Sequence, residues 1–198
     1  MRERLPDATG PFALAQFGGG HANLTYLVAF GDREYVLRRP PLGPVAASAH
    51  DMKREFAVLS NLYRAFPLAP RSYLLCTDVE IVGAEFLIEE RKAGIAIRRD
   101  LPACFQNDPA LARRIGEMLV DTLAALHSVD PASVGLSDLG RPQGYVVRQM
   151  LGWSQRWEKA RTAGSVAAET LLEWLRERAP ESPVVALVHN DYKLDNML

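Results

Sequence analysis

Hydrophobic and polar positions alternate with a period of two in most of residues 12–90. One segment within this range and most of the residues after it have the period of a helix instead. Leu24, Tyr26, Val28 and Phe30 alternate with their neighbours, which is typical of a strand with one buried face. Alternation or short apolar runs bounded by Gly, Pro or Asp predict five strands, at 12–17, 24–30, 34–39, 71–77 and 84–90. Between the third and fourth strands, apolar residues at 47–66 recur at steps of three and four, which predicts a helix.

The residues after 91 predict mainly helices. A long apolar stripe indicates a helix over 108–127, with Asp108 at the N-cap and Pro109 in the first turn. Two further helical stripes begin at Val146 and Ala167. The apolar run 184–188 then predicts a buried strand that opens into a polar loop.

Composition narrows the function classes. The chain has 198 residues, of which 48% are hydrophobic and 24% charged, as in ordinary soluble domains. A formal net charge of −1 gives no reason to expect a nucleic acid or a membrane surface as partner. The oligomeric state does not follow from the sequence. No apolar run reaches membrane-spanning length, and residues 1–10 are polar, so we expect a cytoplasmic protein. Cys76 and Cys104 have unrelated surroundings, which argues against a disulfide or a metal site.

The polar loop at the end of the chain carries the strongest chemical pattern. His189, Asp191 and Asn196 form H-x-D-x-x-x-x-N. A carboxylate at Asp191 can take or orient the proton of a hydroxyl group, and the amide oxygen of Asn196 is a hard ligand suited to Mg²⁺. Lys193 is the cation nearest to Asp191 in sequence and is predicted to contact a phosphate. The alternative is a polar turn whose Asp and Asn side chains cap the local backbone.

This loop resembles the catalytic loop of the protein-kinase-like fold. The form V-H-N-D-Y-K-L-D-N-M-L is closer to the H-G-D-x-x-x-x-N loop of the aminoglycoside phosphotransferase family, which phosphorylates hydroxyl groups of small molecules. The resemblance implies an α+β, protein-kinase-like fold. Residues 1–91 would be a five-stranded antiparallel N-lobe with one inserted helix, and 92–198 an incomplete, mainly helical C-lobe. Asn190 stands where the family has Gly, which matters if this position needs a positive φ.

The turn between the first two strands predicts a phosphate-binding loop. Gly18, Gly19 and Gly20 let the backbone approach a phosphate and point amides at it, although an ordinary hairpin turn would use glycine too. In the resembled family this loop carries G-x-x-N-x-x-Y/F, which Gly20, Asn23 and Tyr26 match.

The third strand reads Y-V-L-R and resembles the V-A-I-K strand of kinases. The resemblance places Val36 against adenine and Arg38 where a phosphate-binding Lys is usual. Arginine departs from the pattern but keeps the charge and can bind phosphate bidentately. Glu55 lies beside the apolar stripe of the inserted helix and is assigned as the partner of Arg38. The alternatives are an edge-strand arginine in water and a surface pair between Glu55 and a neighbouring basic residue.

Two further groups are assigned through the resemblance. The backbone of the hinge after the fifth strand would bind the adenine edge, at Glu89, Glu90 and Arg91. The acceptor would contact a helix of the second lobe, at Trp153, Arg156 and Trp157. Tryptophans at helical spacing also serve simply as core residues.

We therefore expect an ATP- and Mg²⁺-dependent phosphotransferase that acts on a hydroxyl group of a small molecule. F-G-G-G-H-x-N-x-T-Y, Y-V-L-R-R-P-P and H-N-D-Y-K-L-D-N resemble the branch fused to acyl-CoA dehydrogenases. A hydroxyacyl thioester is thus an alternative acceptor to an aminoglycoside. The family's second metal-binding Asp has no counterpart up to Leu198, so we expect these residues alone to be nearly inactive. The alternatives are a non-catalytic pseudo-kinase or nucleotide-binding interaction module and, more remotely, a metal-dependent hydrolase using His189 and Asp191.

Overall fold

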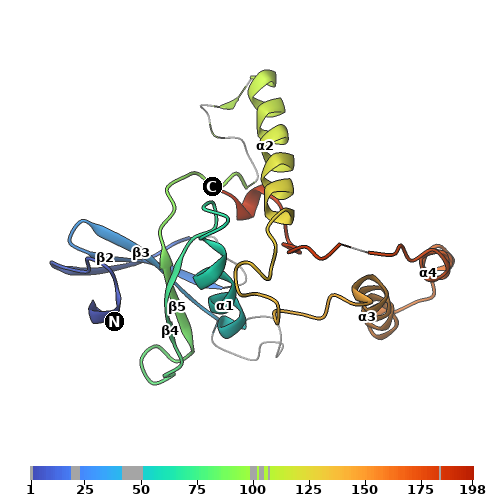
Figure 1. Ribbon diagram of the computed structural model, residues 1–198, viewed down its shortest axis with the longest axis horizontal. Coiled ribbons are helices and arrows are strands. Elements are labelled where there is room, and N and C mark those ends of the chain that lie inside the picture. Colours follow the sequence, from blue (N-terminus) through green and yellow to red (C-terminus); the bar gives the residue numbers. More distant parts are fainter. Residues whose placement is uncertain are drawn as a thin grey trace. The chain divides into compact units, whose positions relative to one another are not determined.

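Five strands form one antiparallel sheet with a helix inserted after the third strand (Figure 1). The structure is a computed structural model that describes residues 2–18, 23–41, 51–98, 102, 105–106, 108–182 and 184–198. The strands lie in the order β1-β2-β3-β5-β4, with bounds β1 Phe12–Gln16, β2 Leu24–Phe30, β3 Arg33–Arg39, β4 Ser72–Cys76 and β5 Phe86–Glu90. The strand order along the chain and the antiparallel pairing are as predicted.

The two faces of the sheet bury different parts of the chain. Val28, Tyr35, Leu37 and Ile88 belong to the main apolar core, which the N-terminal segment covers through Leu5 and Ala8. Helix α1 (Met52–Leu62) packs against β4 and β5. Since alternate residues of a strand point to opposite faces, Val36 and Arg38 point away from the core that holds Tyr35 and Leu37. The β3 strand therefore presents its charged residue on the face opposite this core.

The β5 strand is the most deeply buried strand because β3 and β4 flank it on both edges. Its register with β3 sets Glu89 opposite Val36 and Leu87 opposite Arg38. Residues directly opposite each other in an antiparallel pair share a face of the sheet. Glu89 therefore lies on the same face as Arg38.

The inserted helix is shorter than predicted. Asp51 caps α1 by accepting a hydrogen bond from the Arg54 amide at 2.9 Å, whereas residues 47–50 of the predicted helix lie outside the described residues. The helix ends at Leu62 and turns follow, not at Phe66 as predicted. Pro67 explains the difference, because a proline disfavours helical geometry at the residue before it.

The longest helix, α2 (Pro109–His127), begins as predicted. The Asp108 side chain accepts hydrogen bonds from the amides of Ala110 and Leu111, both at 3.0 Å. The remaining helices, α3 (Tyr145–Ala160) and α4 (Val166–Glu177), belong to a separate compact unit, 137–186. The other unit contains 1–136 and 187–198, and so joins the sheet, α2 and the C-terminal loop. The lobe boundary predicted at residue 91 stays a prediction.

The predicted strand at 184–188 is wrong. The described residues of this run are irregular, and Val184, Val185 and Val188 are exposed while Leu187 is buried. No strand of the described sheet pairs with this segment, so its apolar residues gain no sheet partner.

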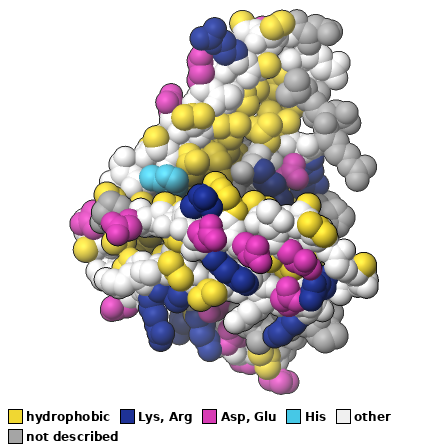
Figure 2. All heavy atoms as spheres, turned by 90° about the vertical axis from the view of Figure 1, so that its right-hand side faces the viewer, with side chains coloured by type: hydrophobic (Ala, Val, Ile, Leu, Met, Phe, Trp, Pro, Cys, Tyr) yellow, Lys and Arg dark blue, Asp and Glu magenta, His cyan; other side chains and the backbone are white. Residues whose placement is uncertain are grey.

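Acidic and basic side chains alternate across the middle of the face seen in Figure 2, and a group of basic side chains lies at its lower left. Hydrophobic side chains are exposed above them. Exposed apolar residues of α2 include Met118 and Val120. Among the described helices, none is both long enough and apolar enough to cross a membrane.

Candidate active site

Arg38 lies between two carboxylates on the face of the sheet covered by α1. Its Nη1 forms an ion pair with Glu55 of α1, the contact that the sequence predicted between residues seventeen positions apart. The same nitrogen lies 3.6 Å from Oε1 of Glu89 on β5. The Arg38 and Glu55 side chains are 33% and 22% exposed, so the guanidinium is still accessible to a ligand. The contact is confirmed, and the phosphate-binding role of Arg38 stays a prediction.

Glu89 is the buried member of this cluster. It is 3% exposed, and its Oε2 has no hydrogen-bond partner among the described residues. Burial raises the pKa of Glu89 to about 7, because the attraction of Arg38 and the repulsion of Glu55 leave the cost of desolvation largely uncompensated. The prediction assigned this position to its backbone alone and missed the side chain. The signal was an ionisable residue inside the apolar run of β5, opposite Val36 in the register.

The C-terminal loop brings three of the predicted residues into direct contact. Asn196 Nδ2 donates hydrogen bonds to the backbone oxygen and to Oδ2 of Asp191, both at 2.8 Å. Lys193 Nζ lies 3.3 Å from Oδ1 of Asp191. The hydrogen bond from Asn196, and then the one from Lys193, lower the pKa of the Asp191 carboxyl. Asp191 is therefore ionised at neutral pH, exposed, and held by the two side chains at the predicted spacing.

The backbone of this loop is fixed by its own residues and by α2. Asn190 has φ 66°, the left-handed conformation that the usual glycine would adopt without strain. Asparagine tolerates this conformation better than most residues. Tyr192 donates a hydrogen bond from its hydroxyl to the backbone oxygen of Leu119 in α2, at 2.6 Å. This tie to α2 was not predicted, because the partner is a backbone atom far away in sequence.

The segment that follows β5 connects the glycine loop with the C-terminus. Arg98 Nη1 donates to the backbone oxygen of Gly18 at 3.3 Å. At Gly94 the backbone approaches Leu198 so closely that a Cβ would lie 2.6 Å from the Leu198 Cβ. Glycine is therefore required at Gly94 for the observed packing. The segment after the predicted hinge thus contacts both the start of the glycine loop and the end of the C-terminal loop, within one unit of the fold.

The donor atoms of the C-terminal loop decide whether it suits a Mg²⁺ ion. Because Nδ2 of Asn196 donates to Asp191, the amide oxygen of Asn196 remains as a hard oxygen donor, and Asp191 adds carboxylate oxygens. The described residues contain no cluster of three or more His, Cys, Asp or Glu that could hold a metal ion. One amide and one carboxylate suit Mg²⁺, which typically keeps several waters and takes phosphate oxygens as further ligands. The residues present therefore fit a Mg²⁺ ion that arrives with a phosphorylated ligand.

The structure describes only some of the other residues predicted for the nucleotide site. Gly19 and Gly20 lie outside the described residues. Glu90 already uses its amide as a donor to the backbone oxygen of Arg71, at 2.8 Å. Arg91 forms an ion pair with Glu34 of β3. Any hinge contact by the Glu90 amide would therefore have to replace an existing bond. Val36, Asn23 and the hinge residues keep their predicted roles as predictions.

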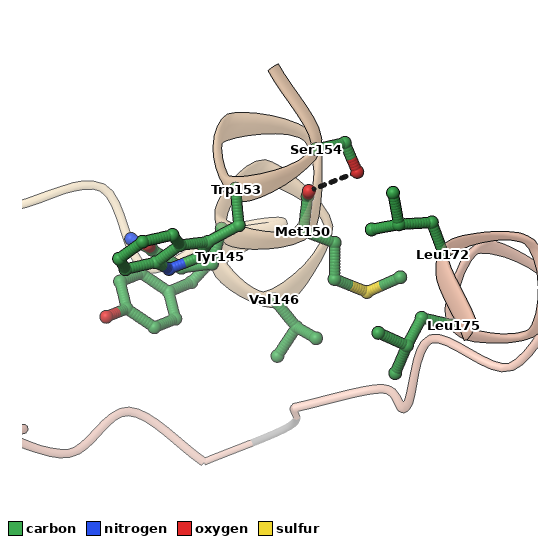
Figure 3. A pocket seen from close by; sticks show the side chains of 8 residues that line it. Tyr145, Val146, Met150, Trp153, Ser154, Leu172 and Leu175 are labelled. Carbon is green, nitrogen blue, oxygen red and sulfur yellow. Dashed lines mark hydrogen bonds between the residues drawn. The ribbon is translucent and has the colours of Figure 1, made fainter. Parts of the chain in front are cut away.

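The three residues predicted for acceptor binding all lie on α3. Trp153 is exposed and carries the Arg156 guanidinium over its ring, 4.7 Å from the centroid. Trp157 is half-buried, and its Nε1 has no partner among the described residues. A pocket of about 350 Å³ opens between α3 and α4, and its lining is almost entirely apolar. Figure 3 shows Met150 of α3 pointing toward Leu172 and Leu175 of α4.

Comparison with known proteins agrees with this geometry. The model of a family described as "Phosphotransferase enzyme family" matches residues 13–198. Acyl-CoA dehydrogenase family member 10 of Mus musculus is 35% identical over 191 residues, which are 96% of this chain and 18% of the mouse protein. Acyl-CoA dehydrogenase family member 11 of Gallus gallus is 34% identical over 192 residues, or 96% of this chain and 24% of that protein. The chain therefore spans less than a quarter of the length of these curated relatives.

A solved structure shows the same fold. The crystal structure of a protein from Ralstonia eutropha, described as a candidate aminoglycoside phosphotransferase, superposes with a TM-score of 0.82 at 29% identity. The match covers 99% of this chain and 57% of that one. The five-stranded sheet, the inserted helix and the C-terminal loop are thus those of a kinase-like fold. The chain belongs to the phosphotransferase enzyme family.

Proposed function

We propose that this chain binds Mg·ATP and transfers the γ-phosphoryl group to a hydroxyl group of a small molecule. The observation that carries the proposal is the Arg38–Glu55 pair, which joins the strand and the helix that a phosphate clamp requires. The ionised Asp191, held by Asn196 and Lys193, supplies the second half of the site. Family membership supports phosphoryl transfer as the reaction class.

Phosphoryl transfer requires the side chains mainly to position the reactants and to offset charge. Asp191 orients the acceptor hydroxyl and accepts its proton as the hydroxyl oxygen bonds to the γ-phosphorus and the bond to the leaving ADP oxygen breaks. Arg38 and Lys193 offset the negative charge of the phosphates, since both are cations accessible to solvent. The amide oxygen of Asn196 would hold Mg²⁺, which would neutralise phosphate charge when it is bound. The lowered pKa of Asp191 keeps it ionised, so it acts chiefly by orienting the hydroxyl.

For the acceptor, we propose a hydroxyacyl compound in preference to an aminoglycoside. The relatives named acyl-CoA dehydrogenase family members support an acyl substrate. The exposed lining of the pocket between α3 and α4 is almost entirely apolar, which suits a hydrocarbon group better than the amines of an aminoglycoside. Trp153 and Arg156 beside it add an aromatic surface and one positive charge, which suit an anionic acyl compound.

The experiment is a transfer assay with γ-labelled ATP, Mg²⁺ and two acceptors, a hydroxyacyl thioester and an aminoglycoside. We expect label on the thioester at a low rate, because the residues up to Leu198 contain no counterpart of the family's second metal-binding Asp, and a further loss of at least a hundredfold in Asp191→Asn. Asp195→Asn is the matched control, because Asp195 is exposed in the same loop and is expected to leave transfer unchanged. Label on the aminoglycoside alone would overturn the acceptor class. Mg·ATP binding without transfer to any acceptor would overturn the reaction and favour a nucleotide-binding module.

A further inference from the structure

The cluster around Arg38 holds one more negative charge than it can balance. Glu55 and Glu89 both approach the same guanidinium nitrogen, Nη1, from different elements. Among the described residues, neither an ion pair nor a hydrogen bond involves Nη2 of Arg38, so this nitrogen is left for an incoming anion. With both carboxylates ionised, the cluster carries a net charge of −1 before any ligand binds. An anion that binds at Arg38 thus enters a site that is already negative.

Of the two carboxylates beside Arg38, Glu89 is less able than Glu55 to remain ionised. Its side chain is 5% exposed, and its Oε2 has no hydrogen-bond donor among the described residues. The groups that face it are Arg38 from β3 and Glu55 from α1, and its register partner on β4 is the uncharged Ser72. Ser72 is buried as well, and its hydroxyl also lacks a partner among the described residues. Glu55 is in contrast the more exposed carboxylate and has the closer contact with Arg38.

We propose that Glu89 takes up a proton from solvent when a nucleotide phosphate binds at Arg38, so that nucleotide binding is linked to protonation of this buried carboxyl. The inference rests on the proposed function, because it needs a phosphate at Arg38. No covalent bond other than the O–H bond of Glu89 forms or breaks. The proton removes one negative charge from the cluster, and Arg38 is then shared between Glu55 and the phosphate. Glu89 is in this account a positioning residue that acts through Arg38.

The burial of Glu89 places its pKa at about 7, which puts the exchange in an accessible pH range. In the free chain near neutral pH, Glu89 is divided between its two forms. A bound phosphate raises the pKa further, so we expect uptake of about half a proton per nucleotide at pH 7 and almost none at pH 6, where Glu89 already holds its proton.

Calorimetry measures this uptake directly. Mg·ATP is titrated at pH 7 in two buffers of different ionisation enthalpy, neither of them phosphate, and the difference in observed heat gives the protons exchanged. We expect uptake in the wild-type chain and none in Glu89→Gln, which keeps the side-chain shape but cannot ionise. Glu85→Gln is the matched control, because it makes the same chemical change at a carboxylate that pairs with Lys53 at the surface. It is expected to keep the wild-type uptake.

A second measurement keeps the test decisive if Glu89→Gln does not fold. The wild-type titration is repeated at pH 6, where Glu89 already holds its proton, and the uptake should then be almost none. Binding without buffer dependence, or the same uptake in Glu89→Gln, would overturn the inference and leave the proposed function standing. The same uptake at pH 6 as at pH 7 would overturn the inference too. No Mg·ATP binding by the folded wild-type chain would overturn the proposed function and this inference with it.

Discussion

Replacing Glu89 by Gln should remove a loss of sheet stability that the wild-type chain undergoes as the pH rises. Burial raises the pKa of Glu89 from 4.5 to about 7 in the folded chain, whereas the unfolded chain keeps the ordinary value. Between these two values the folded chain binds a proton that the unfolded chain has released. The contribution of Glu89 to stability is therefore fully present below pH 4.5 and is lost as the pH rises through about 7.

The magnitude follows from the size of the pKa difference. Each unit of difference corresponds to about 1.4 kcal/mol, so the wild-type chain should lose about 3 kcal/mol relative to Glu89→Gln across this range. At high pH the variant should be the more stable protein, because the wild type then holds a buried carboxylate with one oxygen unpaired. At low pH the two should be similar, since both side chains are then neutral.

The assay must report on the sheet itself. The three tryptophans, Trp153, Trp157 and Trp174, all lie on α3 and α4, so tryptophan fluorescence follows the other unit. Urea titrations at several pH values, read by hydrogen exchange of the β5 amides, give the free energy of unfolding where Glu89 is located. Parallel pH profiles for the wild type and Glu89→Gln would refute the reasoning. Glu85→Gln should follow the wild type, because its carboxylate is paired at the surface.

Three further substitutions test the loop contacts. Gly94→Ala should displace Leu198 and raise hydrogen exchange in the C-terminal loop, whereas Gly116→Ala, where a Cβ meets open space on a helix, should be neutral or stabilising. Asn190→Ala should cost about 1 kcal/mol in urea unfolding because φ is 66°, and Asn190→Gly should cost less. Tyr192→Phe removes a 2.6 Å hydrogen bond to α2 and should cost about 1 kcal/mol, seen as faster exchange in this loop. Equal effects of Ala and Gly at position 190, or unchanged exchange in the other two variants, would contradict these assignments.

Much of the fold follows from local patterns. The strands β2, β3 and β5 were predicted at nearly their observed bounds, because their alternation or apolar run depends on neighbouring residues. The N-cap at Asp108 was predicted for the same reason. The predicted strand at 184–188 failed because a strand needs a hydrogen-bonded partner, which an apolar run by itself does not reveal. The end of α1 was overestimated because Pro67 outweighed the helical spacing of Phe66.

The site was predictable where a motif fixes residue types at set distances. The pairing of Arg38 with Glu55 was predicted in this way and is present. The motif also placed Asp191 and Asn196 in one loop, but the hydrogen bond between their side chains was not predicted. The role of the Glu89 side chain depends on register, burial and the position of α1 together. A sequence gives none of these quantities directly, so the third member of the cluster emerged only from the structure.

The central claim is that Arg38 belongs to a nucleotide site, and titration of Mg·ATP into Arg38→Ala tests it most directly. Arg33→Ala is the control, because Arg33 lies on the same strand and makes an exposed ion pair with Asp7. We expect the wild type and Arg33→Ala to bind Mg·ATP alike, and binding to weaken at least tenfold in Arg38→Ala, with each chain folded by circular dichroism. Equal affinity in the wild type and Arg38→Ala would contradict the account.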